Sequence, residues 1–166
     1  MAITYEPIAT TTLGSAAASY TFSSIPGTYT DLILIANFDG SASSYTTITF
    51  NGVTGTSYSR TRIIGAGTTV SSDRTTSAAG FINLTYNTAG TPSTGVYQIF
   101  NYANTTTYKT ALFRDASRPD DTALTVGLFR GSTGSATDAI TSITLTKASG
   151  NYTVGSTFTL YGIKAA

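Results

Sequence analysis

The longest aliphatic run of the chain lies in residues 31–38, which read Asp-Leu-Ile-Leu-Ile-Ala-Asn-Phe. In a β-strand alternate side chains point to opposite faces, so Leu32 and Leu34 would share one face and Ile33 and Ile35 the other. Turn-forming Pro–Gly and Asp–Gly pairs bound the run, which makes it too short for an ordinary helix. The pattern therefore predicts a central strand whose two faces are both covered by other parts of the molecule.

Shorter segments follow in which apolar and polar residues alternate, without convincing helical periodicity. Each is typical of a half-buried strand. They span residues 16–22, 45–50, 58–64, 79–86, 96–100, 109–114, 123–129, 139–146 and 157–163. Asn51-Gly52 is a favoured two-residue hairpin turn, so segments 45–50 and 58–64 are expected to pair. The polar segment 65–80 is expected to be a long loop or a short edge strand.

Together these segments predict an all-β protein with about ten short strands and long polar loops. An antiparallel β-sandwich or barrel fits this pattern, and a jelly roll is our first choice. The length of 166 residues fits one domain, which we expect to span residues 16–166. Residues 1–15 are expected to form an N-terminal extended arm or an edge strand, with apolar anchors that include Ile3, Tyr5 and Ile8.

The composition excludes several classes of function. The chain has no His, Cys or Trp, so the commonest metal ligand, the commonest general base and every thiol nucleophile are missing. Only 10% of the residues are charged and the net charge is +1, so the basic patch of a nucleic-acid-binding protein is absent. No apolar run reaches the length of a membrane span, and the first residues do not resemble a secretory signal. We therefore expect no nucleic-acid partner, no membrane and no cofactor.

Thr and Ser are abundant, and together with 11 Tyr and 16 Gly they favour strands and turns over helices. The resulting surface would be polar but nearly uncharged. Such a surface fits a protein that is partly covered by other subunits or faces a crowded assembly. A solvated Thr/Ser-rich β-surface, as in many secreted or adhesive proteins, is the alternative.

One stretch concentrates charge, because Arg114, Asp115, Arg118, Asp120 and Asp121 fall within eight residues. The carboxylates could supply oxygen ligands to calcium, but their spacing does not match an EF-hand loop and the arginines could satisfy them directly. We predict no metal site. An ion-paired turn is the simplest interpretation, and an interface that fixes register against a neighbouring subunit is favoured over a cation site.

Nothing in the sequence selects a catalytic site. Eight acidic residues could supply the two carboxylates of a glycosidase, but no feature singles out one pair. We therefore expect a non-enzymatic protein without catalytic residues. Tyrosine side chains could stack on sugars, although strands are enriched in tyrosine in any case. The candidates for such a carbohydrate platform are Tyr45, Tyr58, Tyr86, Tyr97, Tyr102 and Tyr108.

Both ends of the chain carry a resemblance to known proteins. The first stretch runs from Tyr5-Glu6-Pro7-Ile8 to Tyr29-Thr30-Asp31-Leu32, and the second from Ile143-Thr144-Leu145 to Tyr161-Gly162-Ile163. They resemble a family of small β-rich virion proteins of tailed bacteriophages. The middle of the chain, from about residue 40 to 137, follows only the Thr-, Gly- and Tyr-rich style of that family.

The resemblance implies a non-enzymatic, jelly-roll-like module that is found on the capsid surface or as a domain of tail fibres. A chain that starts just before the first matching stretch and stops just after the second is expected to be a free-standing module, hence a capsid decoration or cement protein. The implied partner is the major capsid protein, bound by a homotrimer at local three-fold positions. The implied location is the virion's capsid surface, after assembly in the cytoplasm of the bacterial host. No functional residue of the family can be transferred.

Two functional hypotheses follow. The first is a cement protein in which Ile3, Tyr5 and Ile8 form a docking or trimer arm, with an unanchored polar tail as the alternative. Deleting residues 2–12 should then abolish capsid binding and leave the fold intact. The second is a tail-fibre or receptor-binding domain that recognises host surface glycans through exposed tyrosines.

Overall fold

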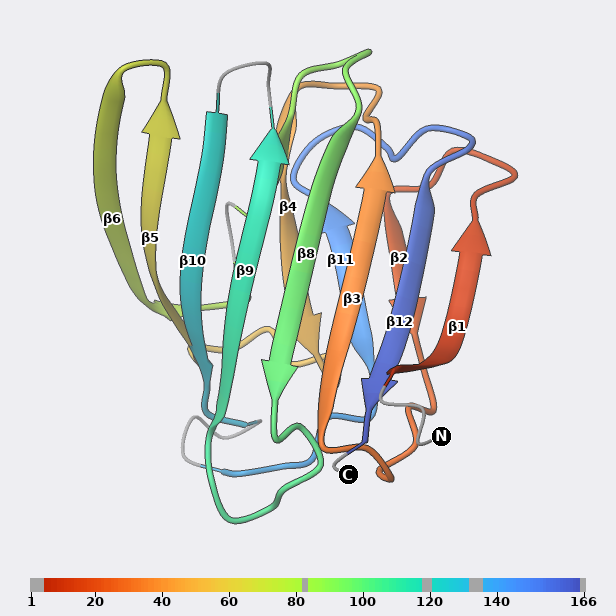
Figure 1. Cartoon of the computed structure of the whole chain (residues 1–166), viewed down its shortest axis with the longest axis vertical. Coiled ribbons are helices and arrows are strands. Elements are labelled where there is room, and N and C mark those ends of the chain that lie inside the picture. The colour runs from red at the N-terminus through yellow and green to blue at the C-terminus, as the bar shows by residue number, and fades with distance from the viewer. Residues whose placement is uncertain (1–4, 82–83, 118–120, 132–135, 165–166) are drawn as a thin grey trace.

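The chain folds into two antiparallel β-sheets that pack face to face (Figure 1). The structure is a computed structural model that describes residues 5–81, 84–117, 121–131 and 136–164. Within these ranges it has twelve strands and no helix. The strands are β1 (Tyr5–Thr12), β2 (Ser19–Phe22), β3 (Asp31–Phe38), β4 (Ser44–Phe50), β5 (Tyr58–Ala66), β6 (Thr69–Ala78), β7 (Tyr86–Asn87), β8 (Ser93–Phe100), β9 (Lys109–Ser117), β10 (Asp121–Phe129), β11 (Ile143–Lys147) and β12 (Thr157–Ile163). The predicted all-β sandwich is confirmed.

The two sheets differ in size. The large sheet has eight strands in the order β1-β12-β3-β8-β9-β10-β5-β6, and the small sheet has four in the order β2-β11-β4-β7. In Figure 1 the small sheet lies behind one half of the large sheet, and the β5–β6 hairpin extends beyond it. A jelly roll distributes eight strands over two sheets as two Greek keys, and the division into eight and four strands does not confirm that topology.

The aliphatic run forms the inner strand β3, which pairs with β12 on one side and β8 on the other. Leu32 and Leu34 point into the core and are fully buried. On the opposite face Ile33 is buried and Ile35 is half-buried, although no second layer of the described chain lies over them. The central strand is therefore confirmed, and the cover predicted for its second face is only partial.

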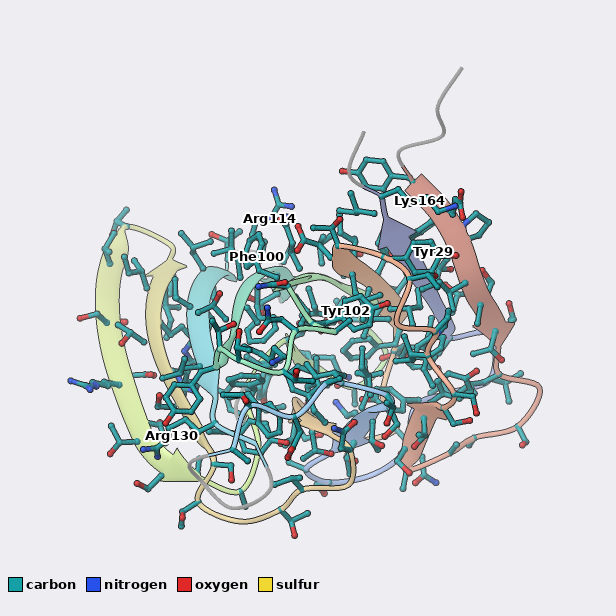
Figure 2. The ribbon with its side chains drawn as sticks, turned by 90° about the horizontal axis from the view of Figure 1, so that it is seen from below. Tyr29, Phe100, Tyr102, Arg114, Arg130 and Lys164 are labelled. Carbon is teal, nitrogen blue, oxygen red and sulfur yellow. The ribbon has the colours of Figure 1, made fainter. Side chains whose placement is uncertain are left out.

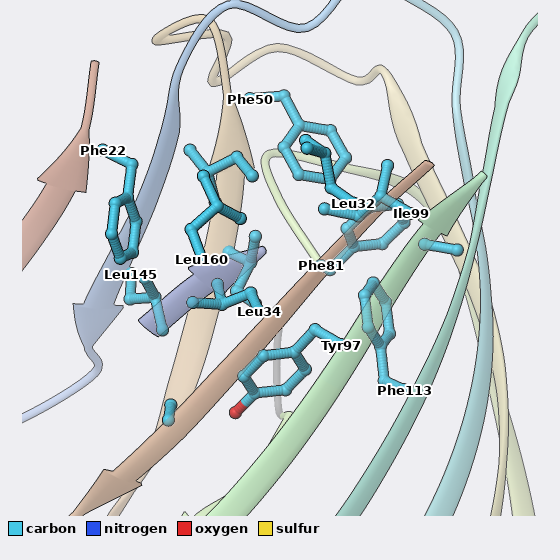
Figure 3. Close-up of a cluster of buried hydrophobic side chains, with 14 of the residues drawn as sticks. Phe22, Leu32, Leu34, Phe50, Phe81, Tyr97, Ile99, Phe113, Leu145 and Leu160 are labelled. Atoms are coloured by element: carbon cyan, nitrogen blue, oxygen red, sulfur yellow. The ribbon is translucent and has the colours of Figure 1, made fainter. Parts of the chain in front are cut away.

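Aromatic and aliphatic side chains from both sheets fill the space between them (Figure 3). Four pairs among the rings of Phe50, Tyr58, Phe81 and Phe129 have ring centres 4.9–5.5 Å apart, and three of these pairs are edge to face. Such ring pairs add about 0.5–1.5 kcal/mol each to the free energy of burial. The hydroxyl of Tyr58 also accepts a hydrogen bond from the backbone N–H of Phe50 at 2.8 Å, so its polar end is satisfied inside the core.

The hairpin predicted at Asn51-Gly52 is wrong. Both residues do have positive φ, 53° and 67°, as a tight turn requires. However, β4 belongs to the small sheet and β5 to the large sheet, where β5 pairs with β10 and β6. The Asn51 side chain accepts hydrogen bonds from the backbone N–H groups of Thr141 (2.8 Å) and Ser142 (3.1 Å), which directs the turn toward the segment before β11.

Two further segments differ from the prediction. The polar segment 65–80 contains the ten-residue edge strand β6 rather than a loop or a short strand. The strand predicted at 79–86 is replaced by a segment whose described residues lie antiparallel beside β4, with a bridge between Phe81 and Ile48 and the short β7 at its end. A Cβ at Gly80 would lie 2.8 Å from the Thr47 Cγ2, so this close approach to β4 depends on glycine. Residues 82–83 lie outside the described part.

Candidate functional site

Strand β10 carries its aliphatic side chains on the outside of the sandwich. Thr125 and Gly127 face the interior, whereas Leu124 and Val126 are 44% and 54% exposed. A Cβ at Gly127 would lie 2.5 Å from the Phe81 ring, so the packing of this core ring requires glycine there. A sheet with one solvated face normally places polar residues outward. The reversed order in β10 indicates that its outer face is built to be covered.

Strand β5 shows the same reversal. Ile63 is 52% exposed, whereas Arg60 and Arg62 are buried on the inner face. Both guanidinium groups donate hydrogen bonds to the carboxylate of Asp73 on β6, that of Arg62 at 2.6 Å, and the Arg62 guanidinium carbon lies 5.7 Å from the centre of the Tyr45 ring. Partial burial alone would raise the pKa of Asp73, but the hydrogen bonds from the two arginines hold it below its usual value.

The strand register joins these exposed residues to those of neighbouring strands. Residues that are directly opposite in adjacent strands share a face, and two rows cross β3, β8, β9, β10 and β5 in this way. The rows consist of Ile35, Val96, Arg114, Leu124 and Ile63, and of Ile33, Gln98, Leu112, Val126 and Thr61. We call the surface formed by these two rows the sheet face. It spans five neighbouring strands, which makes it about 20 Å wide.

Seven of the ten residues in the sheet face are apolar, and the face is nearly uncharged. Arg114 is the one charged residue in the two rows, and Figure 2 shows its side chain pointing away from the interior of the sandwich. Single exposed apolar side chains are common on protein surfaces, but contiguous apolar patches mark places where another molecule binds. The geometry therefore fits a flat docking surface with one charge near its centre.

The structure places the predicted N-terminal arm at the edge of the large sheet. Tyr5 and Ile8 belong to β1, which pairs with β12 over its whole length with one irregularity near residue 8. Tyr5 is exposed, whereas Ile8 packs against the core. Ile3 lies outside the described residues. The alternative of an unanchored tail is therefore excluded for residues 5–12, which form an edge strand.

The structure separates the residues of the charged stretch. Arg114 and Asp115 follow each other in β9, so Arg114 points outward and Asp115 points toward the interior. They cannot act together in one ion-paired turn. Arg118 and Asp120 lie outside the described residues, and Asp121 is described only as the first residue of β10. Of this predicted set, Arg114 is the residue that belongs to the sheet face.

Asp115 lies in an unusual electrostatic environment. Burial raises the pKa of its carboxyl group to about 6, although the nearby charge of Arg62 and a hydrogen bond from Thr85 act in the opposite direction. The Thr85 hydroxyl also forms a 2.6 Å hydrogen bond with the hydroxyl of Tyr97, which is fully buried. This polar group therefore belongs to the interior under β8 and β9.

The candidate tyrosines do not form a platform for sugars. Tyr58, Tyr97 and Tyr102 are fully buried in the core. Tyr45 and Tyr86 are half-buried and pack edge to face against each other, with ring centres 4.8 Å apart. Tyr108 is 43% exposed. Most of the predicted platform thus serves the packing of the sandwich.

A separate hollow lies at one end of the large sheet, between the end of β3 and the start of β8 and β12. Its volume is about 520 Å³, and Asn37, Asp39, Thr94 and the segment Thr153–Thr157 contribute to its walls. It combines polar groups with the exposed side chain of Val154. Among the residues that the structure describes, no group of three acidic side chains is arranged to hold a metal ion.

No family model matches the sequence, and searches of curated proteins and solved structures likewise found no match. The described residues include no helix that is long and apolar enough to cross a membrane.

Sequence reasoning did not identify the sheet face. Alternation along segments 123–129 and 58–64 puts Leu124, Val126 and Leu128 on one face of a strand, and Thr61 and Ile63 on one face of another. What the sequence does not show is which face of a strand looks outward. One feature of the sequence does indicate the outer face. In segment 123–129 the large aliphatic residues alternate with Gly127, and in segment 58–64 Ile63 alternates with Arg60 and Arg62.

Proposed function

We propose that this protein is a non-enzymatic structural protein of a tailed bacteriophage that binds the outer capsid surface and stabilises the capsid lattice. The observation that carries the proposal is the sheet face, an apolar surface on a chain of which only 10% is charged. The resemblance of residues 5–32 and 143–163 to virion proteins supports the phage setting.

The mechanism would be mechanical. A protein that binds the assembled lattice and not free subunits stabilises the lattice by mass action. The stabilising free energy grows with the logarithm of the ratio of the protein's concentration to its Kd. The sheet face would bury Leu124, Val126 and Ile63 against the major capsid protein, and each aliphatic side chain covered fully contributes about 1.5–3 kcal/mol. Arg114 would fix orientation, because a single charge in an apolar contact must meet a partner.

The resemblance also supports a homotrimer at local three-fold positions of the capsid. Such a trimer would present three sheet faces to neighbouring capsid subunits, and linked contacts of this kind raise the overall affinity well above that of one contact. The protein would then reside on the virion's capsid surface after assembly in the host cytoplasm.

The alternative function is a tail-fibre or receptor-binding domain that recognises host glycans. One observation favours it, namely the hollow of about 520 Å³ with Asn37, Asp39 and Thr94 in its walls, since amide, carboxylate and hydroxyl groups can bind sugar hydroxyls. The burial of Tyr58, Tyr97 and Tyr102 counts against it, because stacking on sugars needs exposed rings.

The two functions are separated by a binding experiment. The purified protein is incubated with capsids from which it has been stripped and, in parallel, with host envelope preparations, and its mass in solution is measured. A trimer that rebinds capsids, without dependence on added sugars, is the expected result. A monomer that ignores capsids and binds the envelope would contradict the proposal and favour the glycan-binding alternative.

A further inference from the structure

Lys147, at the end of β11, has a buried amino group in aromatic surroundings. Its side chain is only 5% exposed. The Nζ donates a hydrogen bond to the backbone carbonyl of Ser44 at 2.9 Å and another to the side-chain oxygen of Asn87. The ring centres of Phe38 and Tyr152 lie 5.4 Å and 5.9 Å from the same nitrogen. The amine is thus held against an amide in a largely water-free pocket.

Asn87, on β7, is fully buried, and its amide is fixed from several sides. Its Nδ2 lies 3.5 Å from Oδ1 of Asp39, which also accepts the backbone N–H of Gly40 at 2.6 Å. A Cβ at Gly40 would lie 2.6 Å from the Asn87 Nδ2, so only glycine lets the backbone approach the amide so closely. Amine, amide and carboxylate are therefore brought together by β11, β7 and the end of β3.

The amine is also chemically prepared for attack. Burial lowers the pKa of Lys147 to about 8, with the charge of Asp39 acting in the opposite direction. At neutral pH about a tenth of the amine is then neutral, the form in which nitrogen is a nucleophile. An ordinary surface lysine, with a pKa near 10.4, offers about two-hundred-fold less of that form.

We propose that Lys147 and Asn87 become joined by an intramolecular isopeptide bond, with the carboxylate of Asp39 as the proton carrier. The neutral Nζ attacks Cγ of Asn87, and Asp39 takes a proton from the attacking nitrogen. The new bond between Nζ and Cγ forms as the bond between Cγ and Nδ2 breaks. Asp39 returns the proton to Nδ2, which leaves as ammonia. The step is an exchange of one amide for another, so it needs no oxidant, reductant or cofactor.

The bond would tie β7 to β11 across β4, the strand that lies between them in the small sheet. The two residues are 60 positions apart in sequence, so the bond would close a long covalent loop. Closing such a loop restricts the unfolded chain, as a disulfide does. A chain without cysteine could gain in this way the covalent reinforcement that a disulfide gives other proteins.

The test is the mass of the purified full-length protein under denaturing conditions, followed by trypsin digestion. The expected intact mass is lower than the sequence mass by one ammonia molecule, apart from any N-terminal processing. The expected digest contains a branched peptide in which residues 75–109 are joined to residues 131–164, because Lys147 is blocked to cleavage. Recovery of residues 75–109 as a separate peptide, together with peptides 131–147 and 148–164 from cleavage after a free Lys147, would overturn the proposal.

Three variants assign the roles. Lys147→Met and Asn87→Ala remove the reacting groups, and Asp39→Asn removes the proton carrier; each should abolish the branched peptide. The Tm should fall by roughly 10 °C when the cross-link is lost.

Lys109 is the matched control, since it is equally buried but its Nζ donates to the backbone carbonyls of Thr107 and Thr137. It should be recovered unmodified, and a branched peptide that persists in Asp39→Asn would remove Asp39 from the mechanism. The wild-type digest decides the main claim even if a variant fails to fold.

Discussion

For single residues, the role of an aliphatic side chain depends on which face of the large sheet it lies on. Leu34 and Ile63 both lie in strands of the large sheet, yet Leu34 is fully buried between the sheets and Ile63 is 52% exposed. The first contributes to the core and the second to the sheet face. Sequence reasoning placed Leu34 correctly, because a run of four aliphatic residues demands cover on at least one side.

Leu34→Asp should prevent folding or reduce stability severely. An unpaired carboxylate between the sheets costs several kcal/mol, which is a large part of the stability of an ordinary domain. Ile63→Asp is the control, because an exposed position should change stability by no more than about 0.5 kcal/mol. Urea unfolding of both variants checks this. A Leu34→Asp protein that melts cooperatively near the wild-type midpoint would mean that β3 is wrongly placed.

Asp115 gives the fold a pH dependence of unusual sign. Because its pKa rises to about 6 on folding, the folded state binds this proton more tightly than the unfolded state, and the stabilisation is lost as the pH rises from about 4 through 6. Asp115→Asn should remove the loss, leaving the variant about 1–3 kcal/mol more stable than wild type at pH 7 and nearly equal at pH 4. Urea midpoints measured across this pH range test it. Equal stability of the two proteins at pH 7 would show that the carboxylate is well compensated in its ionised form.

Among the strands, the alternation of apolar and polar residues predicted where strands lie in the sequence better than it predicted which strands pair. The segment predicted at 157–163 coincides with β12, but the turn at Asn51-Gly52 leads from one sheet to the other. Positive φ is a local property, whereas pairing depends on which strands lie nearby after folding. The edge strand β6 was underestimated because its Thr- and Ser-rich sequence, with few apolar residues, has the composition of a loop.

The N-terminal strand is expected to stabilise the fold as well as to bind. Residues of β1 pair with β12, Ile8 packs on the core, and Glu6 binds Lys164 at 2.7 Å. Deleting residues 2–12 should therefore lower the Tm, by roughly 10 °C, in contrast to the intact fold expected from the sequence. Thermal unfolding followed by circular dichroism measures this. An unchanged Tm would return β1 to the role of a detachable arm.

In the whole molecule, the two faces of the large sheet differ in how far the sequence predicts them. The inner face could be predicted in part, since Leu32 and Leu34 belong to a clear apolar pattern and both are buried. The sheet face could not, because it consists of short contributions from five strands that come together only in the folded protein. The Lys147–Asn87 contact was hidden for the same reason, as its partners lie on two strands far apart in sequence.

The most direct test of the account is the affinity of the protein for capsids from which it has been stripped, measured for wild type and two variants. Val126→Asp places a charge on the sheet face, and Val154→Asp places one at an equally exposed valine elsewhere, 64% exposed near the end of the large sheet. We predict at least about a tenfold loss of affinity for Val126→Asp and wild-type affinity for Val154→Asp. Wild-type binding by Val126→Asp would contradict the claim that the sheet face is the docking surface.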